Sequence, residues 1–240
     1  MVLTARYQAL DYDEIDRTLA RLHSRIAERF PESGLRKVCE ELITVAGETK
    51  DCVTFLRSPH WLVRGFVSAV ILGTLVVVVL AVRFTLQIPP GKEGRADVIQ
   101  AIDATASSAV FVGFAVLFLF SLEPRLKRRR ALKVAHQLRS LAHVIDMHQL
   151  TKDPERLLSP ETPDTSSSPE RSMTAPELGR YLDYCSELLS VASKLAALLV
   201  QYFDDPVLLG AVDEIETLST GLSGKIWQKI QMLDSGRIPV

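Results

Sequence analysis

The feature that most constrains this chain is a pair of long apolar runs near its middle. Residues 65–82 read GFVSAVILGTLVVVVLAV and residues 104–122 read ATASSAVFVGFAVLFLFSL, with no Asp, Glu, Lys, Arg or His in either. As a helix, each run extends about 27 Å, close to the hydrocarbon thickness of a bilayer, about 30 Å. A buried helix of a soluble protein normally keeps a polar stripe, which both runs lack. The runs therefore predict a two-helix transmembrane hairpin over residues 61–122, with helices at about 61–82 and 104–122 and a short external loop at 83–103.

Basic residues follow the second run directly, and they predict the orientation of this hairpin. The loop at 83–103 instead offsets its three basic residues with three acidic ones. Because lysine and arginine are retained on the cytoplasmic side, we expect a multi-pass protein of the cell (inner or plasma) membrane with both termini in the cytoplasm. The cluster is also expected to contact anionic lipid headgroups. Its members are Arg125, Lys127, Arg128, Arg129, Arg130 and Lys133.

Nucleic acid is not expected as a partner. The formal net charge is −1, so the chain as a whole does not attract polyanions. A basic cluster that adjoins a membrane run is typical of a topology signal rather than of a nucleic-acid patch.

Small residues recur at four-residue intervals in both apolar runs, at Gly65, Ala69 and Gly73 in the first and at Ala109 and Gly113 in the second. Small side chains allow membrane helices to approach closely. They favour packing of the two helices within one hairpin, with an interface between subunits of an oligomer as the alternative. Both uses stay open at this point.

The rest of the chain has helical periodicity. Residues 1–60 predict a cytoplasmic helical pair, residues 123–156 a basic juxtamembrane helix, and residues 176–240 a cytoplasmic helical hairpin. Residues 157–175 are rich in Ser, Thr and Pro, which predicts a disordered linker. The second helix of the N-terminal pair has apolar side chains at successive a and d positions of a heptad pattern. These positions are Leu35, Val38, Leu42, Val45, Thr49, Cys52 and Leu56.

Two sequence signals predict where the C-terminal helices begin. Thr174 and Glu177 have the spacing of a capping box, and Asp205-Pro206 is typical of a helix start. Because each helix pair has a wide apolar face, we expect the N- and C-terminal pairs to pack together. The predicted fold class is therefore an all-α membrane protein, with a transmembrane hairpin and a cytoplasmic bundle formed by the N- and C-terminal helix pairs.

Residues that carry chemistry are few. Cys39, Cys52 and Cys185 form no CxxC pair, which favours reduced thiols buried in helices. His143 and Asp146 have the i, i+3 spacing that one metal ion requires on a helix, while His136 and His148 lack it. His143 and Asp146 are weak metal candidates, because further ligands must come from another helix. The alternative is that these side chains form part of a polar helix surface.

These observations lead to ranked hypotheses of function. The sequence has no phosphate-binding glycine loop, nucleophile elbow or HExxH motif, so we expect no enzyme and no cofactor. The leading hypothesis is a non-enzymatic integral membrane protein whose bundle is an interaction, scaffold or sensor module. It would bind its own copies or another membrane or cytoplasmic protein. The alternative is an oligomeric two-helix pore gated by the bundle; a membrane-tethered metal enzyme ranks third.

Overall fold

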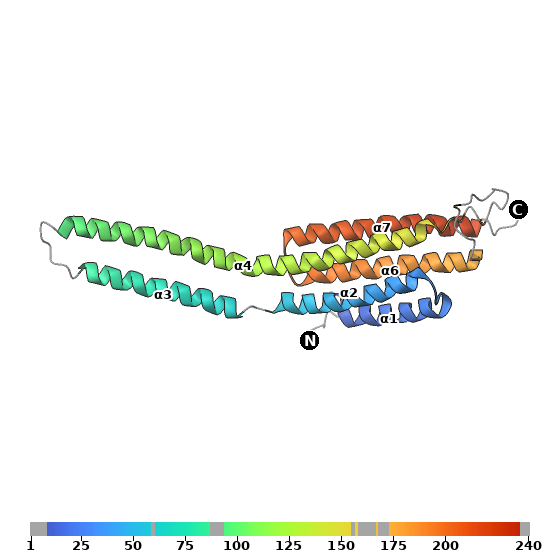
Figure 1. Ribbon diagram of the computed structural model, residues 1–240, viewed down its shortest axis with the longest axis horizontal. Coiled ribbons are helices and arrows are strands. Elements are labelled where there is room, and N and C mark those ends of the chain that lie inside the picture. The colour runs from blue at the N-terminus through green and yellow to red at the C-terminus, as the bar shows by residue number, and fades with distance from the viewer. Residues whose placement is uncertain are drawn as a thin grey trace, which may run out of the picture. The chain divides into compact units, whose positions relative to one another are not determined.

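The computed structural model describes residues 9–58, 61–86, 94–154, 157, 167 and 173–235. Within these ranges, the structure describes only the backbone of residues 61–64, 81, 84–86, 94–99, 101, 102, 104–106 and 109. All regular structure in the described ranges is helical (Figure 1). The helices are α1 (Tyr12–Arg29), α2 (Gly34–Arg57), α3 (Trp61–Leu86), α4 (Gly94–Leu150), α6 (Ala175–Gln201) and α7 (Pro206–Ser235). The expected all-α class is confirmed.

The chain divides into two units. One unit combines Met1–Arg57 with Arg128–Val240, and we call its described part the bundle. The other is Ser58–Lys127, whose described part we call the apolar pair because it consists of α3 and the first part of α4.

Local sequence signals mark the start of α1 and the end of α2. The Asp11 carboxylate accepts a hydrogen bond from the backbone N–H of Asp13 at 2.9 Å and so caps α1. Helix α2 ends at Arg57, just before Pro59, which disfavours a helical conformation for the residue that precedes it. All seven positions of the predicted heptad seam of α2 are buried, because the a and d side chains face the neighbouring helices.

The two C-terminal helices also begin at the predicted caps. The Thr174 side chain accepts from the Glu177 backbone N–H, and the Glu177 carboxylate accepts from that of Thr174, which completes the capping box of α6. Asp205 caps α7 by accepting from the backbone N–H groups of Val207 and Leu208. Helix α6 is the central element, since it packs against α1, α2 and α7 and is buried on most of its circumference.

The bundle includes a helix that the sequence analysis placed outside it. From Arg128 onward, α4 belongs to the bundle, and its apolar stripe lies in the core: Ala131, Ala135, Leu138, Ala142 and Ile145 are all buried. The N- and C-terminal helix pairs pack together through α1, α2 and α6, and this part of α4 joins them as a further helix. The physical reason is that this stripe repeats at helical spacing and needs a partner surface as much as the other helices do.

Among the described residues, no helix is long and apolar enough to cross a membrane. The expected transmembrane hairpin is not supported by this finding. Helix α3 ends at Leu86 and α4 begins at Gly94, so most of the residues expected in the loop at 83–103 are helical; residues 87–93 lie outside the described ranges. Most of the expected linker at 157–175 also lies outside them.

Candidate functional site

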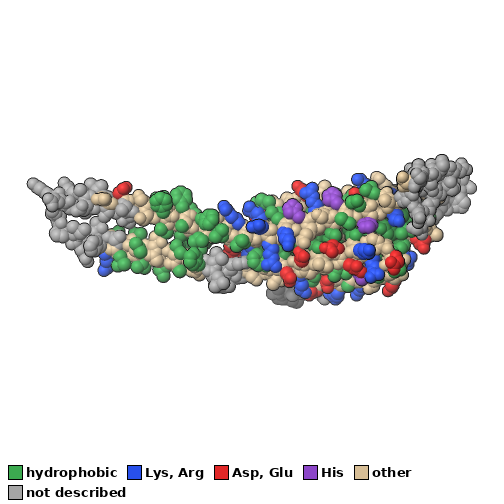
Figure 2. Space-filling model, in the orientation of Figure 1, with side chains coloured by type: hydrophobic (Ala, Val, Ile, Leu, Met, Phe, Trp, Pro, Cys, Tyr) green, Lys and Arg blue, Asp and Glu red, His purple; other side chains and the backbone are tan. Residues whose placement is uncertain are grey.

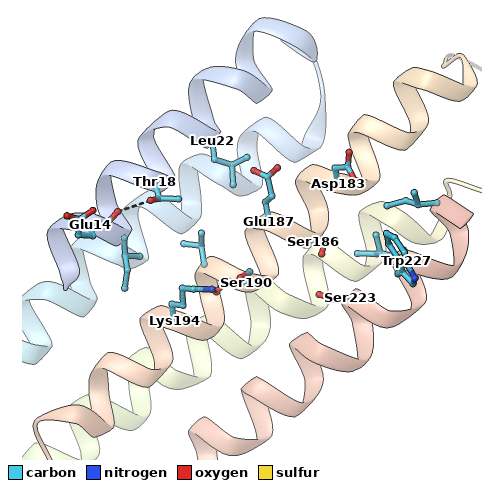
Figure 3. A pocket seen from close by; sticks show the side chains of 14 residues that line it. Glu14, Thr18, Leu22, Asp183, Ser186, Glu187, Ser190, Lys194, Ser223 and Trp227 are labelled. Carbon is cyan, nitrogen blue, oxygen red and sulfur yellow. Dashed lines mark hydrogen bonds between the residues drawn. The ribbon is translucent and has the colours of Figure 1, made fainter. Parts of the chain in front are cut away.

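A groove of about 670 Å³ follows α6 between α1 and α7 (Figure 3). Its floor is a polar stripe of α6 whose members recur at helical spacing and so share one face of that helix. The stripe consists of Asp183, Ser186, Glu187, Ser190 and Lys194. Because the other faces of α6 are largely buried, this stripe is where the central helix of the bundle is reached from outside.

The two walls of the groove supply apolar surface. Helix α1 contributes Ile15 and Leu22, and α7 contributes Ile226, Trp227 and Ile230. The Trp227 side chain is 59% exposed, although tryptophan is a residue that gains much from burial. The groove therefore combines a polar floor with apolar edges, which suits a helix with mixed side chains better than a small polar molecule.

The charged groups of the groove already have partners within the chain. Lys194 Nζ donates to Ser190 Oγ at 2.6 Å. The carboxylates form ion pairs: Arg17–Glu14 at 2.8 Å, Arg25–Glu187 at 2.9 Å and Arg180–Asp183 at 3.3 Å. The three carboxylates are thus neutralised within the chain, whereas the Lys194 ammonium donates to the oxygens of the uncharged Ser190 and has no carboxylate partner among the described residues.

Three serines, Ser186, Ser190 and Ser223, line the groove. Among the described residues that line the groove, neither histidine nor cysteine lies beside these serines; the basic group that contacts one of them is Lys194, whose Nζ lies 2.6 Å from Ser190 Oγ. Sequence analysis did not identify this groove. The signal that could have found it is the polar stripe itself, which repeats along an otherwise apolar helix.

The weak metal candidates His143 and Asp146 and the two neighbouring histidines do not form one cluster. His136 and His143 are exposed, and Asp146 Oδ1 accepts a hydrogen bond from Gln149 Nε2 of its own helix at 2.6 Å. His148 lies against Gly34 instead, and burial, followed by the charge of Lys152, lowers its pKa below the usual value. In the part of the chain that the structure describes, no three His, Cys, Asp or Glu side chains are placed to hold a metal ion.

Four residues of the predicted basic cluster have partners nearby. Arg128 binds Asp205 at 2.7 Å, and the Arg130 guanidinium lies 4.6 Å from the centre of the Phe55 ring. In the apolar pair, Lys127 contacts Glu123 at 3.0 Å, and Arg125 lies 6.0 Å from the centre of the Phe118 ring.

Arg129 and Lys133 differ from the rest of the cluster. Both side chains are exposed, and neither has an ion pair, hydrogen bond or ring contact among the described residues. The basic cluster thus separates into residues that stabilise the fold and residues that are available to a partner.

The small residues proposed for helix packing border empty space. At Gly65, Gly73 and Gly113, a Cβ would meet no atom within 4 Å beyond the helix's own backbone. Ala69 is exposed, and the side chain of Ala109 lies outside the described set. In the described structure, α3 and α4 therefore do not approach each other closely at these glycines. A role of the small residues in contacts between subunits stays a prediction.

The apolar pair exposes many large hydrophobic side chains (Figure 2). Phe111 is 75% exposed, Phe114 68% and Leu72 63%. The least exposed positions of α3, among them Val67, Val70 and Thr74, recur at three- and four-residue intervals and form one narrow stripe. The remaining circumference of the helix is apolar and accessible.

Comparison of the chain with protein-family models, with curated proteins and with solved structures found no match.

Proposed function

We propose that this is a non-enzymatic integral membrane protein of the cell membrane, whose helical bundle is an interaction module that acts as scaffold or sensor. The observation that carries the proposal is the exposure of large apolar side chains on α3 and the first part of α4. Soluble monomers rarely expose contiguous apolar patches larger than a few hundred Å². Covering such surface yields about 25 cal/mol per Å², so an occupant is strongly favoured.

Lipid is the occupant that the sequence favours. The two uncharged runs have the length of a bilayer core when helical, and basic residues follow the second run. The proposed topology is a hairpin inserted from the cytoplasmic side with both termini in the cytoplasm.

Membrane fractionation of the full chain tests this proposal. We expect the protein to stay in the membrane pellet after alkaline carbonate extraction and to enter the supernatant only with detergent. Lysine at two exposed apolar positions, Leu72→Lys with Leu117→Lys, should release the protein or prevent insertion. The matched control Thr217→Lys with Thr220→Lys lies on exposed positions of the bundle and should leave the pellet fraction unchanged. Recovery of the wild-type chain in the carbonate supernatant would overturn the proposal.

The interaction role of the bundle is supported by the groove between α1 and α7. We propose that it receives a helix of a partner protein, laid between the two walls along the stripe of α6. Ser190→Trp places a large ring on the groove floor, whereas Ser24→Trp adds the same ring on the exposed side of α1. A partner that copurifies with the wild type and with Ser24→Trp, and is lost with Ser190→Trp, supports this role. Equal recovery with all three proteins contradicts it.

The oligomeric pore remains the second candidate, because the space beside Gly73 and Gly113 admits the helices of further copies. Gly73→Leu with Gly113→Leu should then abolish oligomers and dye release from liposomes, while Leu72→Val leaves both intact. Absence of wild-type leakage at every protein concentration tested would reject the pore.

A further inference from the structure

The bundle part of α4 places its side chains in distinct directions. Residues on a helix are separated by about 100°, so Arg128, Arg129 and Arg130 point to three different sides. Arg128 turns toward the cap of α7, where it binds Asp205, and Arg130 turns toward Phe55 of α2. Arg129 lies between these two directions and points away from Ala131, which is fully buried in the core.

Arg129 is the first member of an exposed line. Lys133 follows one turn later and His136 two turns later, and all three are exposed. We call Arg129, Lys133 and His136 the α4 ridge. The line continues with Ser140 and His143, so it contains no carboxylate.

Charge on the α4 ridge is not compensated within the described structure. Like charges one turn apart repel, and Arg129 and Lys133 have that spacing without an acidic partner among the described residues. Arg139, farther along α4, shows the contrasting case, because it binds Glu214 of α7 at 2.7 Å. The ridge is therefore a place where a phosphate gains two cationic partners without breaking an existing ion pair.

Aromatic side chains accompany basic ones at the same end of the bundle. The Arg57 guanidinium lies 4.8 Å from the centre of the Tyr202 ring, and Tyr202 is partly exposed three residues before Asp205, the partner of Arg128. Tyrosine together with lysine and arginine is characteristic of the headgroup level of membranes. In the sequence, Arg129 also follows the second apolar run closely, since that run ends at residue 122.

We propose that the α4 ridge binds the phosphate of an anionic phospholipid headgroup, with Arg129 and Lys133 as its two charged donors. This inference rests on the proposed function, because membrane insertion brings the ridge and the lipids together. Each basic residue near an anionic surface strengthens binding about fivefold, so loss of both should weaken it about 30-fold. A lipid is favoured over free phosphate, since an exposed pair of side chains offers no enclosed cage for a small ion.

The test uses the purified full chain in a neutral detergent at constant ionic strength. Three probes are titrated: dioctanoyl phosphatidylglycerol, dioctanoyl phosphatidylcholine and inorganic phosphate. We expect saturable binding of phosphatidylglycerol alone. Arg129→Gln with Lys133→Gln should weaken it about 30-fold and Arg129→Gln alone about fivefold. The matched control is Arg21→Gln with Lys37→Gln, two exposed and unpaired basic residues of α1 and α2 among the described positions, and it should bind as the wild type does.

Three results would overturn the inference: phosphatidylglycerol binding equal in the wild type and the double variant, equally tight binding of inorganic phosphate, or no preference for the anionic lipid. Melting temperatures of all variants establish that each is folded. Carbonate extraction of the same proteins separates this inference from the proposed function. If the wild-type chain stays in the carbonate pellet but shows no lipid preference, only the proposal of lipid binding by the α4 ridge is refuted. If carbonate releases the wild-type chain, the membrane insertion on which that proposal rests is refuted.

Discussion

The two oxygens of the Asp205 carboxylate hold two helices at once. Oδ2 accepts from Arg128 of α4, at 2.8 Å from Nε and 2.7 Å from Nη2. Oδ1 accepts from the backbone N–H groups of Leu208 and Val207 at 3.0 and 3.1 Å and so caps α7. With its side chain only 4% exposed, Asp205 links the start of α7 to the basic segment of α4.

The first prediction concerns this link. Asp205→Ala should lower the free energy of unfolding by about 2–3 kcal/mol, because it removes a helix cap and leaves Arg128 unpaired. Arg128→Gln should cost about 1–2 kcal/mol, since the cap remains while the buried carboxylate loses its partner. Chemical denaturation of both variants and of the double variant measures the coupling, expected at about 1 kcal/mol. Arg139→Gln, which breaks an exposed pair, serves as the control and should cost under about 0.5 kcal/mol. Additive effects of Asp205→Ala and Arg128→Gln would contradict the link.

The second prediction is a pH dependence of stability. Burial acts to raise the pKa of Asp205, but hydrogen bonds from Arg128 and from the backbone N–H groups of Leu208 and Val207 lower it below its usual 3.8. A carboxyl group with a lowered pKa stabilises the fold above its usual pKa and loses that contribution as the pH falls through the folded value. Melting temperatures from about pH 5 to pH 2 should therefore fall less steeply in Asp205→Asn than in the wild type. Identical slopes would show that Asp205 does not carry this effect.

The third prediction tests the contact between α2 and the end of α4. The His148 ring occupies the space where a Cβ of Gly34 would lie. Gly34→Ala should lower the free energy of unfolding by about 1 kcal/mol, because the ring must shift. In a His148→Ala background the same change should be neutral or stabilising, since the ring no longer occupies this space and alanine is the better helix former. Equal effects in both backgrounds would rule the contact out as the cause.

The fourth prediction concerns Lys229, which caps a helix other than its own. Its Nζ donates to the carbonyl oxygens of Gln149 at 2.7 Å and Lys152 at 3.1 Å, at the C-terminal end of α4. Lys229→Met should cost about 1–2 kcal/mol, because both carbonyl groups lose the ammonium donor and that of Gln149 keeps only the backbone N–H of Lys152. Lys225→Met, one turn earlier and exposed, should change the free energy of unfolding by less than about 0.5 kcal/mol in the same denaturation experiment.

The fifth prediction concerns the three cysteines, which are free and buried as the sequence analysis expected. Burial raises the pKa of Cys39 to about 12, that of Cys52 to about 11 and that of Cys185 to about 12. Since the thiolate is the reactive form, a thiol reagent at about pH 8 should leave the native protein unmodified. Mass spectrometry should find three modified cysteines after denaturation and none before. Rapid modification of Cys39 in the native protein would contradict its burial.

Prediction from sequence succeeded where a pattern is short and local. The capping box at Thr174 and Glu177, the cap at Asp205 and the buried seam of α2 are all present. Each depends on residues within one or two helical turns, so the sequence contains the whole signal.

Prediction was less complete where distant segments meet. The basic cluster was treated as one membrane-facing set, yet Arg128 forms an ion pair with Asp205, and the guanidinium of the exposed Arg130 lies over the Phe55 ring. Helical spacing alone does not determine which side of α4 faces the core of the bundle. That orientation decides which basic residues contact other helices and which stay exposed to solvent. The histidines were grouped by nearness in sequence, but the structure separates exposed His143 from His148, which lies against Gly34.

The sequence by itself determined that the chain is helical, where most of its helices begin and end, and which runs are apolar. Those properties follow from caps, prolines and a 3.6-residue period, all of which act over a few residues. Only the tertiary structure decided that α4 completes the bundle, that Arg129 and Lys133 are left unpaired among the described residues, and that α6 is accessible between α1 and α7. These outcomes depend on pairs such as Arg25 and Glu187, which lie 162 residues apart and are brought together by the burial of apolar side chains from every helix of the bundle.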